Sequence, residues 1–505
     1  MSRRRPEPDQ EIVPVVVIGS GASGVAAARA AAAALGGRDG GRAGGQPGGR
    51  DAGRMGDRPG GRDSEGTSSP RFPVTLVGDA APGGGTRLVA DGGVLLDCAT
   101  RGLDWHATLA HLRTVRERVE DHCRRAALRL EGIDAVRGRA GLAGDGQVVI
   151  ESRGQEAPSL VRAERIVLAT GDEERIPDLT GLAETRFFTA ATILKLGELP
   201  PSLVVVGGGP NGCELAQAFA RFGVQVSLVE AGERLLPREP PDVSGLVTAA
   251  LREDRVRVFT SSRAVSVAPT LDGGAWVGIG SGGDLAAEGL LLATGRRPAV
   301  EGLGLATAGV SVSPAGWVRV DEFLATTGPG VLAVGRITGL LPHGATDRVM
   351  ARVAGQNAAA RRSRARWSAA GLPRVVRTSP AVGAVGVGPG DIASIPGARV
   401  SALPMTAVVP GMLGGTSSGL VSLVAGPVPA PRRSLSWSGR GETGSALLGA
   451  SIVGPQAGEL AGLVAVALRT GMTVEQLADA PLSSRTWAAA LQHAAAGLTA
   501  APDLS

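Results

Sequence analysis

Two glycine clusters in the chain have the spacing that binds a dinucleotide. Each follows a short run of Val and Ile or Leu and precedes a segment typical of a helix. In this GxGxxG pattern the first glycine permits a tight turn, the second lets a pyrophosphate approach the backbone, and the third lets helix and strand pack closely. The N-terminus of the following helix then faces the phosphates with free amides. The glycines are Gly19, Gly21 and Gly24 in the first cluster, and Gly207, Gly209 and Gly212 in the second.

An acidic residue at the end of the next strand can accept the hydroxyls of a ribose. The second cluster is followed by the strand-like run QVSLV and then by Glu230. At about 4 Å and an effective dielectric constant near 20, a carboxylate opposes one phosphate charge by roughly 4 kcal/mol. Glu230 therefore predicts NADH rather than NADPH. After the first cluster, the run 73–79 has Gly78 at the acidic position, and the neighbouring Asp79 is predicted to replace it.

Strands and helices positioned in this way predict an α/β fold with two Rossmann-like dinucleotide-binding domains and a C-terminal α+β dimerisation domain. Two segments rich in Gly, Arg, Pro or Ser are predicted to be a disordered insert (36–71) and a flexible loop (427–445). The expected domains are 1–171 for FAD binding, 172–297 for NAD binding, 298–370 as a central segment that completes the FAD domain, and 371–505 for dimerisation.

Composition excludes several other classes of protein. With 505 residues, 43% hydrophobic and 20% charged, the chain is globular, and its net charge of +5 is too small to favour nucleic acid. The apolar N-terminal run is explained by its glycine turn rather than by a signal peptide, and no transmembrane segment is expected. Cys98, Cys123 and Cys213 have no CxxC spacing, so no metal site or disulfide framework is predicted, and a cytoplasmic location is expected.

The arrangement of motifs resembles the flavin-dependent pyridine nucleotide–disulfide oxidoreductases, the family of lipoamide dehydrogenase and mercuric reductase. Within that family it resembles the NAD(P)H-quinone dehydrogenase-type members that lack the redox disulfide. The resemblance covers nearly the whole chain outside 36–71 and 427–445. The motifs that carry it are GSGASG, PGGGT, the ATG of 169–171, GGGPNGCELA, ATGRRP, TTGPGVLAVG and GASIVGPQAGEL.

The resemblance implies FAD and NADH as cofactors and a set of residues for each. Those expected for FAD are Gly19, Gly21, Gly24 and Asp79 at the adenosine half, Ala140 at the adenine, Thr86, Thr170, Gly171 and Gly335 along the flavin, and Gly344 at the start of a helix that faces it. Those expected for NADH are Gly207, Gly209, Gly212, Glu230 and Gly295. Two catalytic candidates remain: Glu214 matches the family glutamate near the nicotinamide, and His343 is a candidate proton donor.

The chain departs from this family where disulfide chemistry takes place. Arg87 and Gly92 occupy the two positions of the redox CxxxxC pair. Ala480 and Arg485 stand where a His–Glu pair would serve a departing thiolate. Both parts of the disulfide machinery are therefore missing together.

A third departure concerns FAD itself. Arg336 replaces an aspartate that takes a ribitol hydroxyl, and it either pairs with the pyrophosphate or weakens flavin binding. The intact glycine turn and ATG favour retained binding.

These observations predict an FAD-dependent NAD(P)H oxidoreductase that passes hydride from NADH to FAD and electrons on to a diffusible small-molecule acceptor such as a quinone. The alternative is a catalytically degenerate family member that acts as a nucleotide-binding or scaffold protein. By resemblance, a homodimer is expected through residues from about 371 onward.

Overall fold

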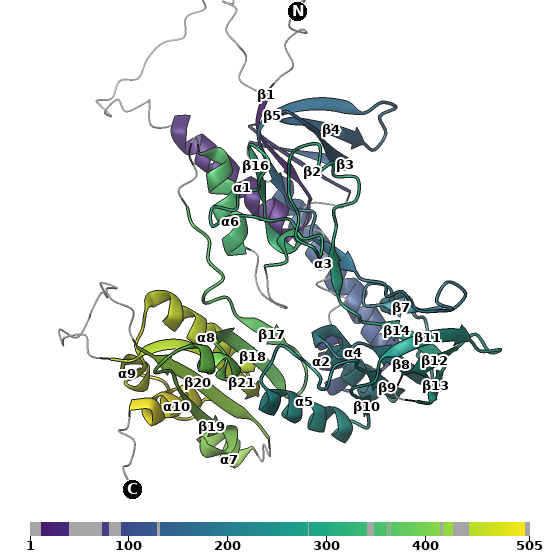
Figure 1. The fold of residues 1–505 in the computed structure, drawn as a ribbon, viewed down its shortest axis with the longest axis vertical. Helices are drawn as coiled ribbons and strands as arrows, with labels where there is room; N and C mark the ends of the chain where they lie inside the picture. The colour runs from purple at the N-terminus through teal and green to yellow at the C-terminus, as the bar shows by residue number, and fades with distance from the viewer. Residues whose placement is uncertain are drawn as a thin grey trace, which may run out of the picture.

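Three sheet-containing units make up the part of the chain that the computed structural model describes (Figure 1). The first unit contains the N-terminal strand, the second the middle of the chain, and the third its C-terminal part. The described residues are 12–39, 73–79, 92–128, 132–280, 282–340, 348–360, 362, 365–414, 418–427 and 444–499.

The first unit is a six-stranded sheet in which β1 pairs in parallel with both β2 and β5. Strand β16 pairs in parallel with β5, so the segment after the second unit returns to complete this sheet. The strands β3, β4 and β5 form an antiparallel meander. The elements are β1 (Ile12–Ile18), α1 (Ala22–Asp39), β2 (Val74–Gly78), β3 (Ile133–Gly144), β4 (Gln147–Ser152), β5 (Ser159–Leu168), β16 (Val331–Ala333) and α6 (Arg348–Ala359).

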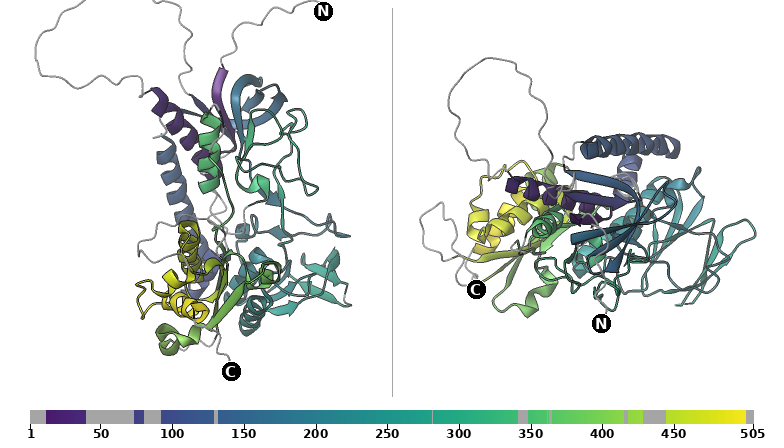
Figure 2. Two further views of the ribbon diagram at one scale, coloured as in Figure 1. Left: turned by 60° about the vertical axis from the view of Figure 1, so that its left-hand side comes forward. Right: turned by 90° about the horizontal axis from the view of Figure 1, so that it is seen from above.

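Helices α1 and α6 pack closely side by side against this sheet (Figures 1 and 2). Small residues make the approach possible, because a Cβ atom at Gly355 would collide with the backbone oxygen of Ala27. Helix α1 extends to Asp39, so residues 36–39, predicted as the start of the disordered insert, are helical. The alanine-rich helix continues over them because extending an existing helix adds one backbone hydrogen bond per residue, without a new nucleation step. Residues 40–71 lie outside the described residues.

The second unit is a parallel sheet in the order β10-β9-β8-β14-β7, with a small antiparallel sheet beside it. Its core contains the buried apolar strands VVV and VSLV predicted around the second glycine cluster. The elements are β7 (Phe188–Thr189), β8 (Ser202–Val206), α4 (Pro210–Arg221), β9 (Gln225–Val229), α5 (Pro241–Glu253), β10 (Arg257–Phe259), β11 (Ala264–Pro269), β12 (Ala275–Ile279), β13 (Asp284–Ala287) and β14 (Gly289–Leu292).

Two helices and a two-stranded crossover join these units. The long helix α3 reaches from the first unit to the second along the outside of the molecule (Figure 2). Its first residue, Trp105, donates from Nε1 to the oxygen of Leu196 at 3.2 Å and packs on the rings of Phe219 and Phe222. The joining elements are α2 (Gly92–Thr100), α3 (Trp105–Leu128), and the antiparallel pair β6 (Asp172–Glu174) and β15 (Arg296–Pro298).

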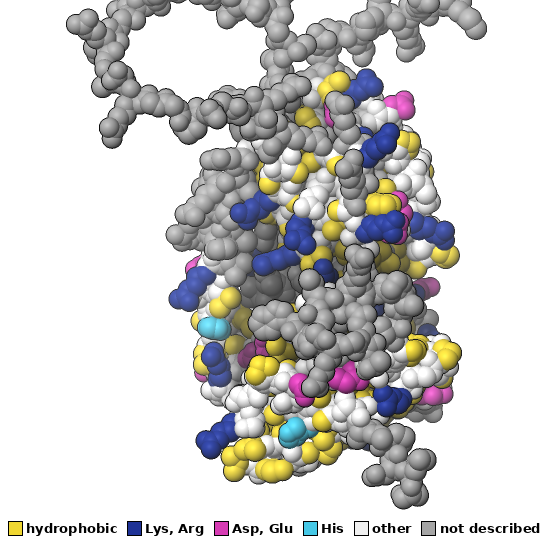
Figure 3. Space-filling model, turned by 90° about the vertical axis from the view of Figure 1, so that its left-hand side faces the viewer, with side chains coloured by type: hydrophobic (Ala, Val, Ile, Leu, Met, Phe, Trp, Pro, Cys, Tyr) yellow, Lys and Arg dark blue, Asp and Glu magenta, His cyan; other side chains and the backbone are white. Residues whose placement is uncertain are grey.

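The third unit is an antiparallel five-stranded sheet in the order β17-β18-β21-β20-β19, with helices packed on it. Exposed hydrophobic side chains gather at the lower end of the face seen in Figure 3, the end at which α7 lies in Figure 1. The elements are β17 (Arg374–Val376), β18 (Ala381–Gly386), β19 (Arg399–Pro404), α7 (Val409–Leu413), β20 (Leu420–Gly426), β21 (Ala446–Gly454), α8 (Ala457–Thr470), α9 (Val474–Ala478) and α10 (Ala489–Thr499).

The predicted fold class is confirmed: parallel α/β units are followed by a C-terminal α+β unit. Among the described residues, no helix is both long and apolar enough to cross a membrane.

Candidate dinucleotide sites

The two glycine turns have nearly the same geometry. Gly19 and Gly207 adopt φ values of +120° and +112°, and a side chain at either would collide with the backbone of the ATG segment beside it. A Cβ at Gly24 or Gly212 would collide with the carbonyl oxygen of the first glycine in its own cluster. At both middle positions the Cβ direction is open, with no atom within 4 Å. Each turn therefore leaves space at the glycine where a pyrophosphate approaches.

The two turns differ at the residue after the first glycine and at the end of the next strand. Where one of these two positions has a side chain, the other has a glycine. In the second unit Gly208 has no side chain, and the carboxylate of Glu230 reaches over to accept its N–H at 2.6 Å. In the first unit Ser20 takes the place of Gly208, and a Cβ at Gly78 would collide with the Ser20 side chain. This contact explains why a glycine stands where Glu230 stands in the second unit.

Asp79 lies directly after Gly78, at the end of strand β2. Its Oδ2 accepts from the Nε of Arg139 at 3.1 Å, and both side chains are exposed. Ala140 follows Arg139 in β3 and pairs with Ile150 of β4, just past the point where β2 and β3 stop pairing. Asp79, expected at the adenosine half of FAD, and Ala140, expected at the adenine, thus lie at one edge of the sheet, the edge of the Gly21 turn.

A pocket of about 760 Å³ opens beside the second turn. Four of the five residues expected for NADH line it, and they are Gly207, Gly209, Glu230 and Gly295. Gly212 packs beneath Gly207 instead, as its position in the pattern predicts. The Glu230 carboxylate is fixed by two backbone donors, since Oε2 accepts from Gly208 and Oε1 from the N–H of Gly232 at 2.6 Å each.

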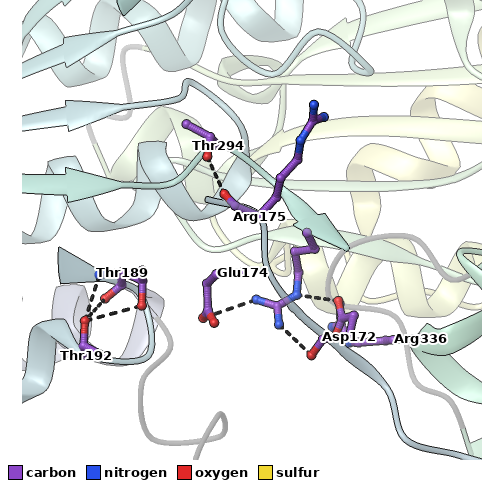
Figure 4. Close-up of polar contacts among 8 residues, drawn as sticks. Asp172, Glu174, Arg175, Thr189, Thr192, Thr294 and Arg336 are labelled. Carbon is purple, nitrogen blue, oxygen red and sulfur yellow. Dashed lines mark hydrogen bonds and ion pairs between the residues drawn. The ribbon is translucent and has the colours of Figure 1, made fainter. Parts of the chain in front are cut away.

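A cluster of charged side chains joins β6, the first crossover strand, to β15, the second, next to this pocket (Figure 4). The Nε of Arg296 donates to Oδ2 of Asp172, whose side chain is 3% exposed, and Arg296 also pairs with Glu174 at 3.5 Å. Nη1 of Arg336 lies 3.8 Å from the same Asp172 oxygen. Arg336 therefore has a carboxylate partner within the chain, which neither sequence interpretation of this residue included.

Of the remaining residues expected along the flavin, Thr170 and Gly335 form hydrogen bonds within the chain, and Gly171 borders open space. The hydroxyl of Thr170 donates to the oxygen of Ala299 at 2.7 Å, and the N–H of Gly335 donates to Sδ of Met350 at 3.3 Å. The Cβ direction at Gly171, where φ is +80°, is open with no atom within 4 Å. Thr86, His343 and Gly344 lie outside the described residues.

Glu214 does not line the pocket beside Glu230, and its expected place near the nicotinamide stays a prediction. It is buried in α4, and its Oε1 accepts the N–H of Arg377 at 2.8 Å. Helix α4 directs the side chain toward α2, where Gly92 lies against it, and it borders a second pocket of about 1040 Å³. Glu214 therefore lies where α4 meets the start of α2, beside one of the two positions of the family's redox pair.

Three site residues escaped the sequence analysis: Asp172, Arg175 and Arg296. The signal that could have found them is the charge after each ATG, because Asp-Glu-Glu follows the first and Arg-Arg follows the second. In the structure these runs are β6 and β15, which pair in the register Arg296 with Glu174 and Arg297 with Glu173. Opposite charges facing each other across an antiparallel pair are stabilising.

Cys98 and Cys213 are the two cysteines whose side chains the structure describes. Both are free thiols, and both are buried. Burial strongly raises the pKa of the Cys213 thiol, and the carboxylates of Glu214 and Glu230 raise it further. Burial also raises the pKa of the Cys98 thiol, against the opposing effect of Arg101. Both thiols are therefore held in their neutral, unreactive form.

Comparison with known proteins agrees with this geometry. Residues 72–361 match the family model described as pyridine nucleotide-disulphide oxidoreductase. The chain is 30% identical over 346 residues to a dihydrolipoyl dehydrogenase of Bacillus subtilis, covering 68% of this chain and 71% of that protein. It is 32% identical over 359 residues to a mercuric reductase of Streptomyces lividans, covering 70% and 71%. The fold is similar to that of LpdA from Mycobacterium tuberculosis, with a TM-score of 0.77 at 24% identity over 96% of this chain and 99% of that one.

Two glycine turns, each with an open middle position and each following a parallel strand, are typical of oxidoreductases that bind two dinucleotides. The chain belongs to the pyridine nucleotide–disulphide oxidoreductase family, whose members are flavoproteins that use FAD and NAD(P)H. The described residues fit FAD at the first turn, because Gly21 leaves the phosphate position open and Asp79 stands at the strand end. There the N-terminus of α1 would face the pyrophosphate.

Proposed function

We propose that the chain is an FAD-dependent NADH oxidoreductase that works without a redox disulfide and passes electrons to a diffusible acceptor such as a quinone. The observation that carries the proposal is the packing at Gly92, one of the two positions of the family's redox cysteines. A Cβ there would lie 2.6 Å from Cβ of Glu214 and 3.0 Å from the backbone N of Leu215. A cysteine at this position would require α2 to move away from α4.

The C-terminal unit supports the same conclusion. Ala480 stands at the family's histidine position between α9 and α10, and its carbonyl oxygen accepts from Nε2 of Gln492 at 3.0 Å. Neither Ala480 nor Arg485 has a side chain that could act as a general acid near neutral pH. The chain therefore has no described group for protonating a thiolate where the family keeps one.

The cofactor supplies the redox chemistry: when bound, FAD accepts two electrons from a nicotinamide and releases them to an acceptor. The protein supplies position and charge. Gly21 and the N-terminus of α1 would hold the FAD pyrophosphate, and Gly209 and the N-terminus of α4 that of NADH. Glu230 would accept the ribose hydroxyls and oppose a 2′-phosphate, which favours NADH over NADPH.

Oxidation of NADH with menadione as acceptor, in buffer supplemented with FAD, tests the proposal. We expect yellow protein that bleaches on anaerobic addition of NADH, turns over with menadione, and shows no activity on lipoamide or on a glutathione-type disulfide. A colourless preparation that takes up no FAD on reconstitution would overturn the proposal. So would disulfide reduction as fast as menadione reduction.

A second candidate function is that of a nucleotide-binding scaffold that has lost turnover. Arg336 favours it, because a cation paired with Asp172 stands where the family has the aspartate that takes a ribitol hydroxyl. The same assay separates the two functions. Turnover at or below the background of free flavin, with NADH binding retained, would select the scaffold.

We also propose that the chain forms a homodimer through its C-terminal unit. Two of its helices expose apolar side chains, since Met412 and Leu413 of α7 are 66% and 83% exposed and Val466 of α8 is 62% exposed. Light scattering is expected to give twice the chain mass of 50.7 kDa. A monomer at micromolar concentration would contradict this.

A further inference from the structure

The pocket beside Glu230 contains arginines in two different situations. Arg296 is engaged, because it donates to Asp172 and pairs with Glu174. Arg175 and Arg263 also line the pocket, and neither guanidinium has a hydrogen bond or ion pair to any described residue. Two guanidinium groups without an ion-pair partner among the described residues therefore line this pocket.

The backbone of Arg175 is fixed although its side chain is exposed. Its N–H donates to the oxygen of Gly295 at 3.0 Å, and its carbonyl oxygen accepts from the hydroxyl of Thr294 at 2.7 Å. These bonds attach the residue after β6 to the turn before β15. Figure 4 shows the Arg175 side chain pointing away from Asp172 and Glu174.

Two glycines leave open space in the pocket that Arg175 lines. Gly295 has a φ of +107°, and the Cβ directions of Gly295 and Gly209 are both open, with no atom within 4 Å. Gly209 is the N-cap of α4, and the start of this helix, at Pro210 and Asn211, lines the pocket. The two open glycines thus line the same pocket as the unpaired guanidinium of Arg175.

Three carboxylates line the pocket, and among the described residues none of them forms an ion pair with Arg175 or Arg263; one of the three, Asp178, is exposed. Glu230 directs its two oxygens to the N–H groups of Gly208 and Gly232, and Glu174 pairs with Arg296. A pyrophosphate carries two negative charges and is held best by a guanidinium together with backbone donors.

We infer that Arg175 binds the pyrophosphate of the nicotinamide dinucleotide, as a binding residue contributed by the crossover between the first two units. The inference rests on the proposed function for the identity of the ligand. Arg263 is assigned a different place, because it follows Ser262, whose N–H donates to the Glu230 carbonyl oxygen at 2.9 Å. It therefore lies beside the acid that faces the ribose, at the adenosine end.

Titration of the FAD-loaded protein with NADH, ADP-ribose and adenosine tests this assignment in Arg175→Gln, Arg175→Lys and the control Arg297→Gln. Arg297 is in the same crossover, outside the pocket lining, and forms exposed ion pairs with Glu173 and Glu301. Arg175→Gln is expected to weaken NADH and ADP-ribose by about tenfold to a hundredfold. Adenosine, which has no phosphate, should bind as in the wild type, Arg175→Lys should recover part of the loss, and Arg297→Gln should match the wild type.

In steady-state turnover, Arg175→Gln should raise the KM for NADH and leave kcat nearly unchanged, since binding alone is lost. Equal ADP-ribose affinity in Arg175→Gln and the wild type would overturn the inference. Equal losses in Arg175→Gln and Arg297→Gln, or a parallel loss for adenosine, would also overturn it. An Arg175-dependent affinity for ADP-ribose without any turnover would support this inference and defeat the proposed function.

Discussion

Nη1 of Arg336 lies 3.8 Å from Oδ2 of Asp172, so the arginine that replaces an expected aspartate is held by a carboxylate from the first crossover. Asp172 also accepts from Nε of Arg296 in the second crossover. One buried carboxylate thus connects three segments: the start of β6, the start of β15 and the turn at Gly335–Thr338. The pair gives Arg336 a partner that does not depend on a bound nucleotide.

Loss of the Asp172 charge should destabilise the protein. Asp172→Asn removes the nearly buried carboxylate that pairs with Arg336 and leaves Arg296 with Glu174 alone, so we expect the free energy of unfolding to fall by about 3 kcal/mol. Urea unfolding measures this change. In the control Glu173→Gln, which removes an exposed pair with Arg297, the fall should stay below about 1 kcal/mol. Equal effects of the two substitutions would show that Asp172 has no special role.

The first glycine cluster should separate cofactor binding from folding. Gly21→Ala places a methyl group in the open space where the FAD pyrophosphate would lie, so FAD content should fall at least tenfold with the thermal unfolding midpoint of the apoprotein unchanged. Gly24→Ala drives a methyl group into the carbonyl of Gly19 and should lower that midpoint by several degrees. Full FAD content in purified Gly21→Ala protein would contradict the assignment of this turn.

Glu230 should determine the choice between NADH and NADPH. Glu230→Gln keeps a side chain of the same shape and removes the charge that opposes a 2′-phosphate, so the ratio of kcat/KM for NADPH to that for NADH should rise by about tenfold or more. Glu233→Gln is the control, since Glu233 is exposed and does not line the pocket. An unchanged ratio in Glu230→Gln would remove the basis for the NADH preference.

The buried thiols should remain unreactive in the native protein. Burial raises the pKa of Cys98 and Cys213 above the usual value of 9.0, so both are neutral at pH 8. The stability gained from the neutral thiols is fully present below pH 9 and declines as the pH rises above it. Mass spectrometry after treatment with iodoacetamide should find both unmodified until urea unfolds the chain. An alkylated Cys98 or Cys213 after anaerobic NADH treatment of folded protein would argue for a redox role.

Several features follow from local sequence. The spacing of Gly19, Gly21 and Gly24 predicts a strand–turn–helix because steric limits on φ and on helix–strand contact act within a few residues. For the same reason, roles for the second cluster and for Glu230 could be predicted from short stretches of chain. The order of strands and helices along the chain, and hence the α/β class, is also a property of local pattern.

Contacts between distant segments decided the rest. That Ser20 excludes a side chain at Gly78, that Gly92 lies against Glu214, and that Asp172 holds Arg336 all depend on tertiary packing. The sequence alone determined where two nucleotides could be bound, because backbone sterics and hydrogen bonding act over short stretches. Only the tertiary structure decided which charges are neutralised and which, like that of Arg175, remain free for a ligand, because ion pairs form between residues that folding brings together.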